Sequence, residues 1–109
     1  MITGFLQVKY DLIYDVNLSP IQLRVLMVLI QKQEYTISIG EEYFYCYESW
    51  IGSNLHISIR SVKMAIKYLK DNGYIKVQQK KGTDGRVNYY RVNPKYFVNS
   101  NPKVKTDVG

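Results

Sequence analysis

Apolar residues recur at helical spacing in the stretch that follows Ser19. Ser19 is a favourable N-cap, Pro20 suits the first position of a helix, and Gln22 has the spacing that completes a capping box. The sequence therefore predicts a helix that begins at Pro20. Its apolar positions form two adjacent faces, the first with Ile21, Val25, Val28 and Leu29 and the second with Leu23, Leu26, Met27 and Ile30.

This predicted helix is apolar around most of its circumference, with little polar surface before Gln31. A helix of that kind has to be covered on more than one side. Two interpretations stay open. Either the helix is the centre of the core, wrapped by the N-terminal segment and the sheet, or a part of it, or of the N-terminal segment, forms a homodimer surface.

Residues 35–47 alternate in polarity and are rich in aromatic and β-branched side chains. This pattern predicts a strand that ends near Ile39, then a polar turn, and then a short strand from Tyr43. Glu41 and Glu42 are neighbours in that turn. Because they do not face each other across a cleft, a catalytic acid–base pair is not predicted there.

Two shorter helices are predicted in the middle of the chain. The first covers about residues 47–55 and is followed by a turn at His56 and Ile57. The second covers residues 59–72, with Ser58 as its N-cap and a left-handed stop at Gly73. The side chains expected to face the core are Ile51 and Leu55 on the first helix and Val62, Ala65, Ile66 and Leu69 on the second.

A basic β-hairpin is predicted to follow. Residues 74–79 and 87–92 have the composition of strands, and residues 80–86 form a loop whose glycines permit a tight turn. The loop contains Gly-x-x-Gly but lacks the lysine and the following helix of a phosphate-binding P-loop, so nucleotide binding is not predicted. Its three basic residues predict contact with a phosphate backbone or a minor groove.

Charge is distributed unevenly along the chain. Residues 1–53 carry three basic and six acidic side chains, whereas residues 54–109 carry twelve basic and three acidic ones. The positive charge therefore coincides with the predicted helix pair and hairpin. A polyanion such as double-stranded DNA is the expected partner of this half.

The outward face of helix 59–72 is expected to contact DNA, because no acidic residue occurs between Ser49 and Lys70 and solvated helix faces usually mix both signs. Arg60 is the first candidate for a bidentate contact with guanine, and Lys67 is better placed for phosphate. Ser61 and Met64 would read or pack on neighbouring bases, and Lys63 suits either role. The candidate DNA-binding residues are Ser58, Ile59, Arg60, Ser61, Lys63, Met64 and Lys67 of the helix and Lys80, Lys81, Thr83 and Arg86 of the hairpin.

Few residues are suited to catalysis or metal binding. A single cysteine, Cys46, allows no internal disulfide and no cysteine-based zinc site, and it is expected to be a buried apolar residue. The single histidine, His56, is interpreted as structural. The few acidic residues of the basic half are scattered along the chain. We therefore expect no enzyme activity, no cofactor, no metal and no small-molecule ligand.

Length and hydropathy bound the organisation of the chain. At 109 residues with 46% hydrophobic content, one domain is expected over residues 1–97, followed by a polar tail or linker start over residues 98–109. No apolar run approaches the roughly 20 residues of a membrane-spanning helix, and the N-terminus lacks a signal-peptide pattern. These features predict a cytoplasmic protein without membrane contact.

Three segments together follow a family pattern: LSPIQLRVLMVLI as an opening helix, ISIRSVKMAIKYLKDNGYI as a recognition helix that runs into a wing strand, and GRVNYYRVNP as a second wing strand. In this pattern, residues 11–97 resemble the winged helix-turn-helix domains near the N-termini of plasmid and phage replication initiators of low-GC Gram-positive bacteria. The resemblance implies an α+β fold with a three-helix core, a small antiparallel sheet and a basic β-hairpin wing. It also implies origin binding, often as a dimer. The chain departs from the pattern at His56, where many members carry a small residue.

The same fold serves other tasks, so the predicted fold does not by itself decide the function. One alternative is a small transcriptional regulator or a plasmid-partition protein that binds DNA in the same way. Another is a protein-interaction module, in which the tyrosine-rich surface and the apolar first helix bind a partner.

Overall fold

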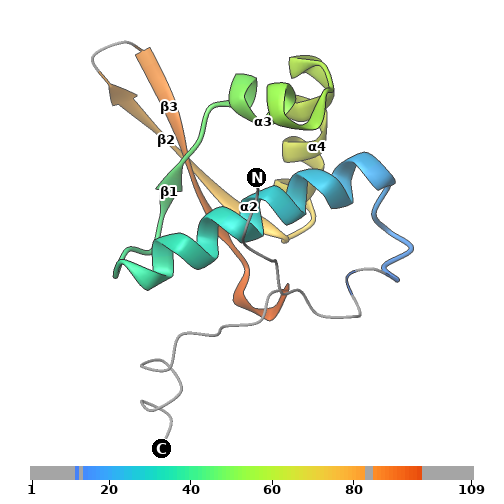
Figure 1. The fold of residues 1–109 in the computed structure, drawn as a ribbon, viewed down its shortest axis with the longest axis horizontal. Coiled ribbons are helices and arrows are strands. Elements are labelled where there is room, and N and C mark those ends of the chain that lie inside the picture. Colours follow the sequence, from blue (N-terminus) through green and yellow to red (C-terminus); the bar gives the residue numbers. More distant parts are fainter. Residues whose placement is uncertain (1–11, 13, 83–84, 97–109) are drawn as a thin grey trace, which may run out of the picture.

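A computed structural model describes residues 12, 14–82 and 85–96 of the chain (Figure 1). The proposed tail at 98–109 lies outside these residues, and so does most of the N-terminal segment. The helices are α2 (Pro20–Ser38), α3 (Glu48–Leu55) and α4 (Ile59–Asp71), the strands are β1 (Phe44–Tyr45), β2 (Ile75–Gly82) and β3 (Gly85–Val92), and a short 3-10 turn spans Pro94–Tyr96.

Over the residues that the structure describes, the fold is α+β, with three helices and one three-stranded antiparallel sheet in the order β1-β3-β2. Its arrangement is consistent with a winged-helix topology. β1 lies between α2 and α3 in sequence and pairs with the base of β3, Phe44 opposite Tyr90 and Tyr45 opposite Tyr89. Figure 1 shows the far ends of β2 and β3 extending beyond the helices. In the described part of the chain, no helix is long and apolar enough to cross a membrane.

The start of α2 is as predicted. The Ser19 hydroxyl accepts a hydrogen bond from the Gln22 backbone N–H at 3.2 Å, and the Gln22 side chain accepts one from the Ser19 N–H at 2.9 Å. This reciprocal capping box satisfies two amide groups that the helix itself leaves without partners.

The predicted strand ending near Ile39 is wrong, because α2 continues to Ser38. The β-branched side chain of Thr36 is accommodated within the helix, where its hydroxyl donates to the Lys32 carbonyl at 2.7 Å and its side chain is buried. The helix then stops at Gly40, which takes a left-handed φ of 84°. Tertiary packing has overridden the local β propensity of this segment.

Gln33 ties the second half of α2 to the sheet. It is only 2% exposed, and its amide Nε2 donates to the Glu42 carbonyl at 2.8 Å while its Oε1 accepts from the Val92 N–H at 2.8 Å. This one side chain therefore joins α2, the segment before β1 and the end of β3. Buried backbone groups need such partners. We call these two hydrogen bonds of Gln33 the clamp, because together they fix the position of α2 against the sheet.

The core lies between α2, α4 and the inner face of the sheet. Val25, Leu26, Leu29 and Ile30 of α2 are fully buried, whereas Ile21 at the helix start is 40% exposed. α2 therefore contributes to the centre of the core, as predicted. Its predicted cover by the N-terminal segment falls mostly outside the described residues, and the homodimer surface stays a prediction. The other core-facing predictions hold for α3 and α4, where Ile51, Val62, Ala65, Ile66 and Leu69 are buried and Leu55 is half-buried.

The loop before α2 is tied to the far end of α4. The Tyr74 hydroxyl donates to the Asp15 carboxylate at 2.6 Å, and the Tyr68 hydroxyl donates to the Asn17 carbonyl. The hydrogen bond from Tyr74, with a second from the Asn17 backbone, holds the pKa of Asp15 below its ordinary value. Burial, reinforced by Asp15, raises the pKa of Tyr74.

This contact predicts a small acid sensitivity of folding. Since the folded-state pKa of Asp15 is lowered, its stabilising contribution is fully present above its ordinary pKa of 3.8 and is lost as the pH falls through the folded value. Asp15→Asn should reduce the drop in unfolding free energy between pH 6 and pH 2 by less than about 1 kcal/mol, because solvent screens the site. Urea denaturation of the wild type, Asp15→Asn and Tyr74→Phe at both pH values measures it. An unchanged drop in Asp15→Asn would contradict this account.

Candidate nucleic-acid interface

The turn between α3 and α4 sets how α4 is presented. His56 ends α3 in the left-handed region at φ 58°, and the Ile57 N–H donates to the Gly52 carbonyl at 3.0 Å. A Cβ on Gly52 would lie 2.8 Å from the Ile57 carbonyl oxygen and 3.5 Å from a methyl of Val62. The close approach of α3, the turn and α4 therefore requires glycine at this position.

Ser58 caps α4, as predicted. Its hydroxyl accepts from the Ser61 N–H at 3.1 Å and donates to the Ser61 hydroxyl at 3.0 Å. Both serine side chains are thus engaged with each other at the start of the helix. A role for Ser61 in reading a base stays a prediction, and it would require this hydroxyl pair to accept a further partner.

The outward face of α4 brings the predicted helix residues together at the surface. Ile59 is 47% exposed and Met64 is 64% exposed, and both lie beside exposed basic side chains. Single exposed apolar side chains are common on protein surfaces, so it is their place among the basic side chains of α4 that makes these two candidates for contact with bases. The exposed basic residues of this helix are Arg60, Lys63, Lys67 and Lys70, and Ser61 is half-buried.

Two lysines of this face have acidic partners that the charge pattern did not predict. Lys63 Nζ lies 3.6 Å from a carboxylate oxygen of Glu48 at the start of α3, and Lys67 Nζ lies 2.9 Å from Asp71. Both lysine side chains are exposed, although the Glu48 side chain is only 23% exposed. Solvent screens each pair at its lysine end, so each contributes little to stability. Arg60 takes part in none of the ion pairs found among the described residues.

The hairpin is longer and its loop is shorter than predicted. Backbone pairing continues past Lys80 opposite Val87 to Gly82 opposite Gly85, so most of the predicted loop 80–86 belongs to the strands. Glycines occupy both of the last paired positions. The register places Lys81 opposite Arg86.

The wing residues are described to different degrees. Lys80 is exposed, and its ammonium lies 4.7 Å from the centre of the Tyr89 ring. Thr83 lies outside the described residues, and for Lys81 and Arg86 only the backbone is described. The left-handed Gly73, at φ 81°, lies in the short turn of residues 72–74 between α4 and β2, so the hairpin follows closely after the helix.

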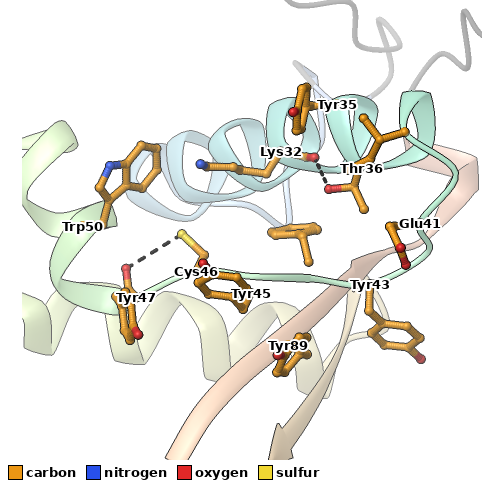
Figure 2. A pocket seen from close by; sticks show the side chains of 12 residues that line it. Lys32, Tyr35, Thr36, Glu41, Tyr43, Tyr45, Cys46, Tyr47, Trp50 and Tyr89 are labelled. Carbon is orange, nitrogen blue, oxygen red and sulfur yellow. Dashed lines mark hydrogen bonds between the residues drawn. The ribbon is translucent and has the colours of Figure 1, made fainter. Parts of the chain in front are cut away.

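An aromatic cleft of about 540 Å³, which the sequence did not single out as a site, lies between the second half of α2 and the segment from β1 to α3. Figure 2 shows Lys32 extending from α2 towards Trp50, with Tyr45 and Tyr47 on the other side. Cys46 is buried here, as predicted, and burial raises the pKa of its thiol. The alternation of residues 43–47 signals which rings point outwards, but not that α2 faces them.

Acidic, histidine and cysteine side chains do not form a cluster in the described part of the chain. No three of them lie close enough together there to hold a metal ion. The absence of enzyme activity and of a cofactor stays an expectation.

No protein-family model, curated protein or solved structure matched the chain, so its resemblance to replication initiators rests on the sequence pattern alone.

Proposed function

We propose that this chain is a winged helix-turn-helix domain that binds double-stranded DNA sequence-specifically, with α4 as the recognition helix and the β2–β3 hairpin as the wing. The observation that supports it best is the division of α4 into two faces. Val62, Ile66 and Leu69 are buried, while Arg60 and Met64 are exposed beside basic neighbours. A helix anchored in this way can enter the major groove without disturbing the core.

The roles proposed for the side chains follow from their positions. Arg60 lies in the first turn of α4 and is the proposed reader of a guanine. Lys63 and Lys67 would exchange Glu48 and Asp71 for DNA phosphates. Lys80 and Lys81 would contact the backbone beside the groove. Ser58, Ile59, Thr83 and Arg86 are proposed to complete the contact.

The biological task proposed is origin binding in plasmid or phage replication, which follows from the sequence resemblance. A transcriptional regulator or a partition protein would use the same surface, so these remain alternatives with the same chemistry. A homodimer is proposed as the form that would bind a target with repeated half-sites.

Selection of bound sequences from a random duplex library tests the proposal. We expect an enriched motif that binds more than about a thousandfold more tightly than random DNA at physiological salt. Its affinity should fall steeply as salt rises, since phosphate contacts release counterions. Absence of enrichment together with a shallow salt dependence would favour the protein-interaction module instead.

Arg60→Ala and Lys81→Ala should have different effects on the selected site. Loss of Arg60 should relax the preference at one base pair and cost about 1–3 kcal/mol of binding free energy, whereas loss of Lys81 should weaken specific and random DNA alike. Titration of both duplexes with each variant measures this, with Lys95→Ala in the 3-10 turn as the control for lost positive charge. Equal losses on both duplexes for Arg60→Ala would refute the proposed division of roles.

A further inference from the structure

We infer that a row of aromatic side chains at the base of the hairpin binds unpaired bases of single-stranded DNA by stacking, an inference that extends the proposed function from the duplex to a strand leaving it. The row consists of Tyr89 on β3, Tyr45 on β1, Tyr47, and Trp50 on α3, all of which line the aromatic cleft. Figure 2 shows these four side chains along the cleft, from Tyr89 to Trp50.

The first step of the argument is the continuity of the row. The ring centres of Tyr89 and Tyr45 are 5.9 Å apart, and those of Tyr45 and Tyr47 are 6.1 Å apart. Tyr45 and Tyr89 are direct cross-strand partners, so the pairing of β1 with β3 holds both rings on one face of the sheet. Successive bases of a single strand stack on aromatic side chains arranged in this way, whatever their sequence.

The second step is exposure. Tyr45 is 58% exposed, Tyr47 56% and Trp50 39%, although their neighbours Phe44 and Cys46 are buried. The sheet ends at β1, so nothing further in the described sheet covers this edge. Tyr89 is half-buried. Contiguous exposed apolar side chains of this kind are a feature of interaction sites.

The third step is charge, which favours a nucleic acid over an apolar peptide. Lys32 Nζ lies 4.3 Å from the centre of the Trp50 ring, and Lys80 Nζ lies 4.7 Å from that of Tyr89, so an ammonium stands at each end of the row. Neither lysine belongs to an ion pair within the described residues. The one acidic residue that lines the cleft is Glu41, which lies beside Tyr43 and away from Trp50 (Figure 2). Cations beside aromatic rings match the alternation of phosphates and bases along a single strand.

The fourth step is location. Lys80 belongs both to the proposed wing and to the end of the row, because its side chain lies over Tyr89. A strand that leaves a duplex at the wing would therefore meet Tyr89 first and then Tyr45. An apolar peptide in the same cleft would leave both ammonium groups without an anionic partner.

The test uses oligodeoxythymidine of 20 nucleotides and the intrinsic fluorescence of Trp50, the single tryptophan of the chain. We expect saturable quenching of Trp50 by the oligonucleotide, as a stacked base requires. Tyr45→Ala and Tyr47→Ala should each weaken its binding about tenfold or more, while Tyr45→Phe, which keeps the ring, should bind like the wild type. Tyr14→Ala, at a tyrosine 79% exposed outside the row, is the matched control.

Two duplex measurements separate this inference from the proposed function. Tyr45→Ala should leave binding to a blunt duplex unchanged, and Arg60→Ala should leave binding to the oligonucleotide unchanged. If the oligonucleotide neither binds nor quenches Trp50 while the blunt duplex binds specifically, the inference is overturned, the proposed function stands, and the cleft is left to a protein partner. If the oligonucleotide binds through the row but no duplex is bound specifically, stacking stands and the proposed function is overturned.

Discussion

Replacement of Gln33 by alanine is expected to lower the free energy of unfolding by about 3–5 kcal/mol. Val92 is fully buried, and the truncation leaves its N–H without a hydrogen-bond acceptor. It also removes the hydrogen-bond donor to the Glu42 carbonyl. It also opens a cavity between α2 and β3. Because small domains are stable by only about 5–15 kcal/mol, this one polar side chain accounts for a large share of the total.

Urea denaturation followed by circular dichroism measures the effect, and two further variants divide it. Gln33→Met keeps most of the volume and loses only the hydrogen bonds, so its loss should be clearly smaller than that of the alanine variant. Gln31→Ala removes the same side chain from an exposed position of α2 and should stay within about 0.5 kcal/mol of the wild type. A Gln33→Ala protein as stable as Gln31→Ala would show that the clamp is not needed.

Gly52→Ala is expected to lower the free energy of unfolding by about 2 kcal/mol, although alanine is the better helix former. Helix propensity alone would favour alanine by about 1 kcal/mol. The new Cβ, however, would lie 2.8 Å from the Ile57 carbonyl oxygen, a backbone atom that cannot rotate away as a side chain can. Overpacking typically costs about 1–3 kcal/mol, and a rigid backbone neighbour puts this site at the upper end of that range, so the strain outweighs the gain in helix propensity.

The control for Gly52 is its neighbour Ser53, which is exposed on the same helix. Ser53→Ala should be neutral or slightly stabilising in the same denaturation experiment. Since Gly52 holds the turn before α4, the alanine variant should also show weakened binding to the selected duplex at temperatures where it remains folded. If Gly52→Ala were as stable as Ser53→Ala, α3 and α4 would have to move apart at no cost in free energy, which would contradict this prediction.

Most helix positions could be predicted because their signals are local. The capping box at Ser19, the cap at Ser58 and the stop at Gly73 each depend on residues within one turn of the chain. The continuation of α2 past Tyr35 could not be predicted in this way, because the second half of this helix is packed by long-range contacts such as the hydrogen bond between Gln33 and Val92, 59 positions away. The position of Gln33, four residues after Leu29, was the available sign that it faces the core.

In the candidate site too, features set by local residues could be predicted, whereas features set by contacts between distant segments could not. The exposed face of α4 follows from the helical period alone, so the placement of Arg60 and Met64 at the surface could be predicted. The contact between Lys63 and Glu48 joins two helices, and the cleft joins Lys32 of α2 to Trp50 of α3. No local pattern contains such pairings, since they arise only when the helices pack together.

Because β1 is short, only the base of the hairpin packs into the core, and the rest of the hairpin is free to vary in sequence. β1 supports only Tyr89 and Tyr90 of β3, and beyond Val77 and Tyr90 none of the described hairpin side chains is buried. Surface segments of that kind tolerate insertions, deletions and changes of charge at little cost. The distal hairpin can therefore be lengthened, shortened or recharged over generations while the core is inherited intact, and any preference that the tip confers can evolve independently of the fold.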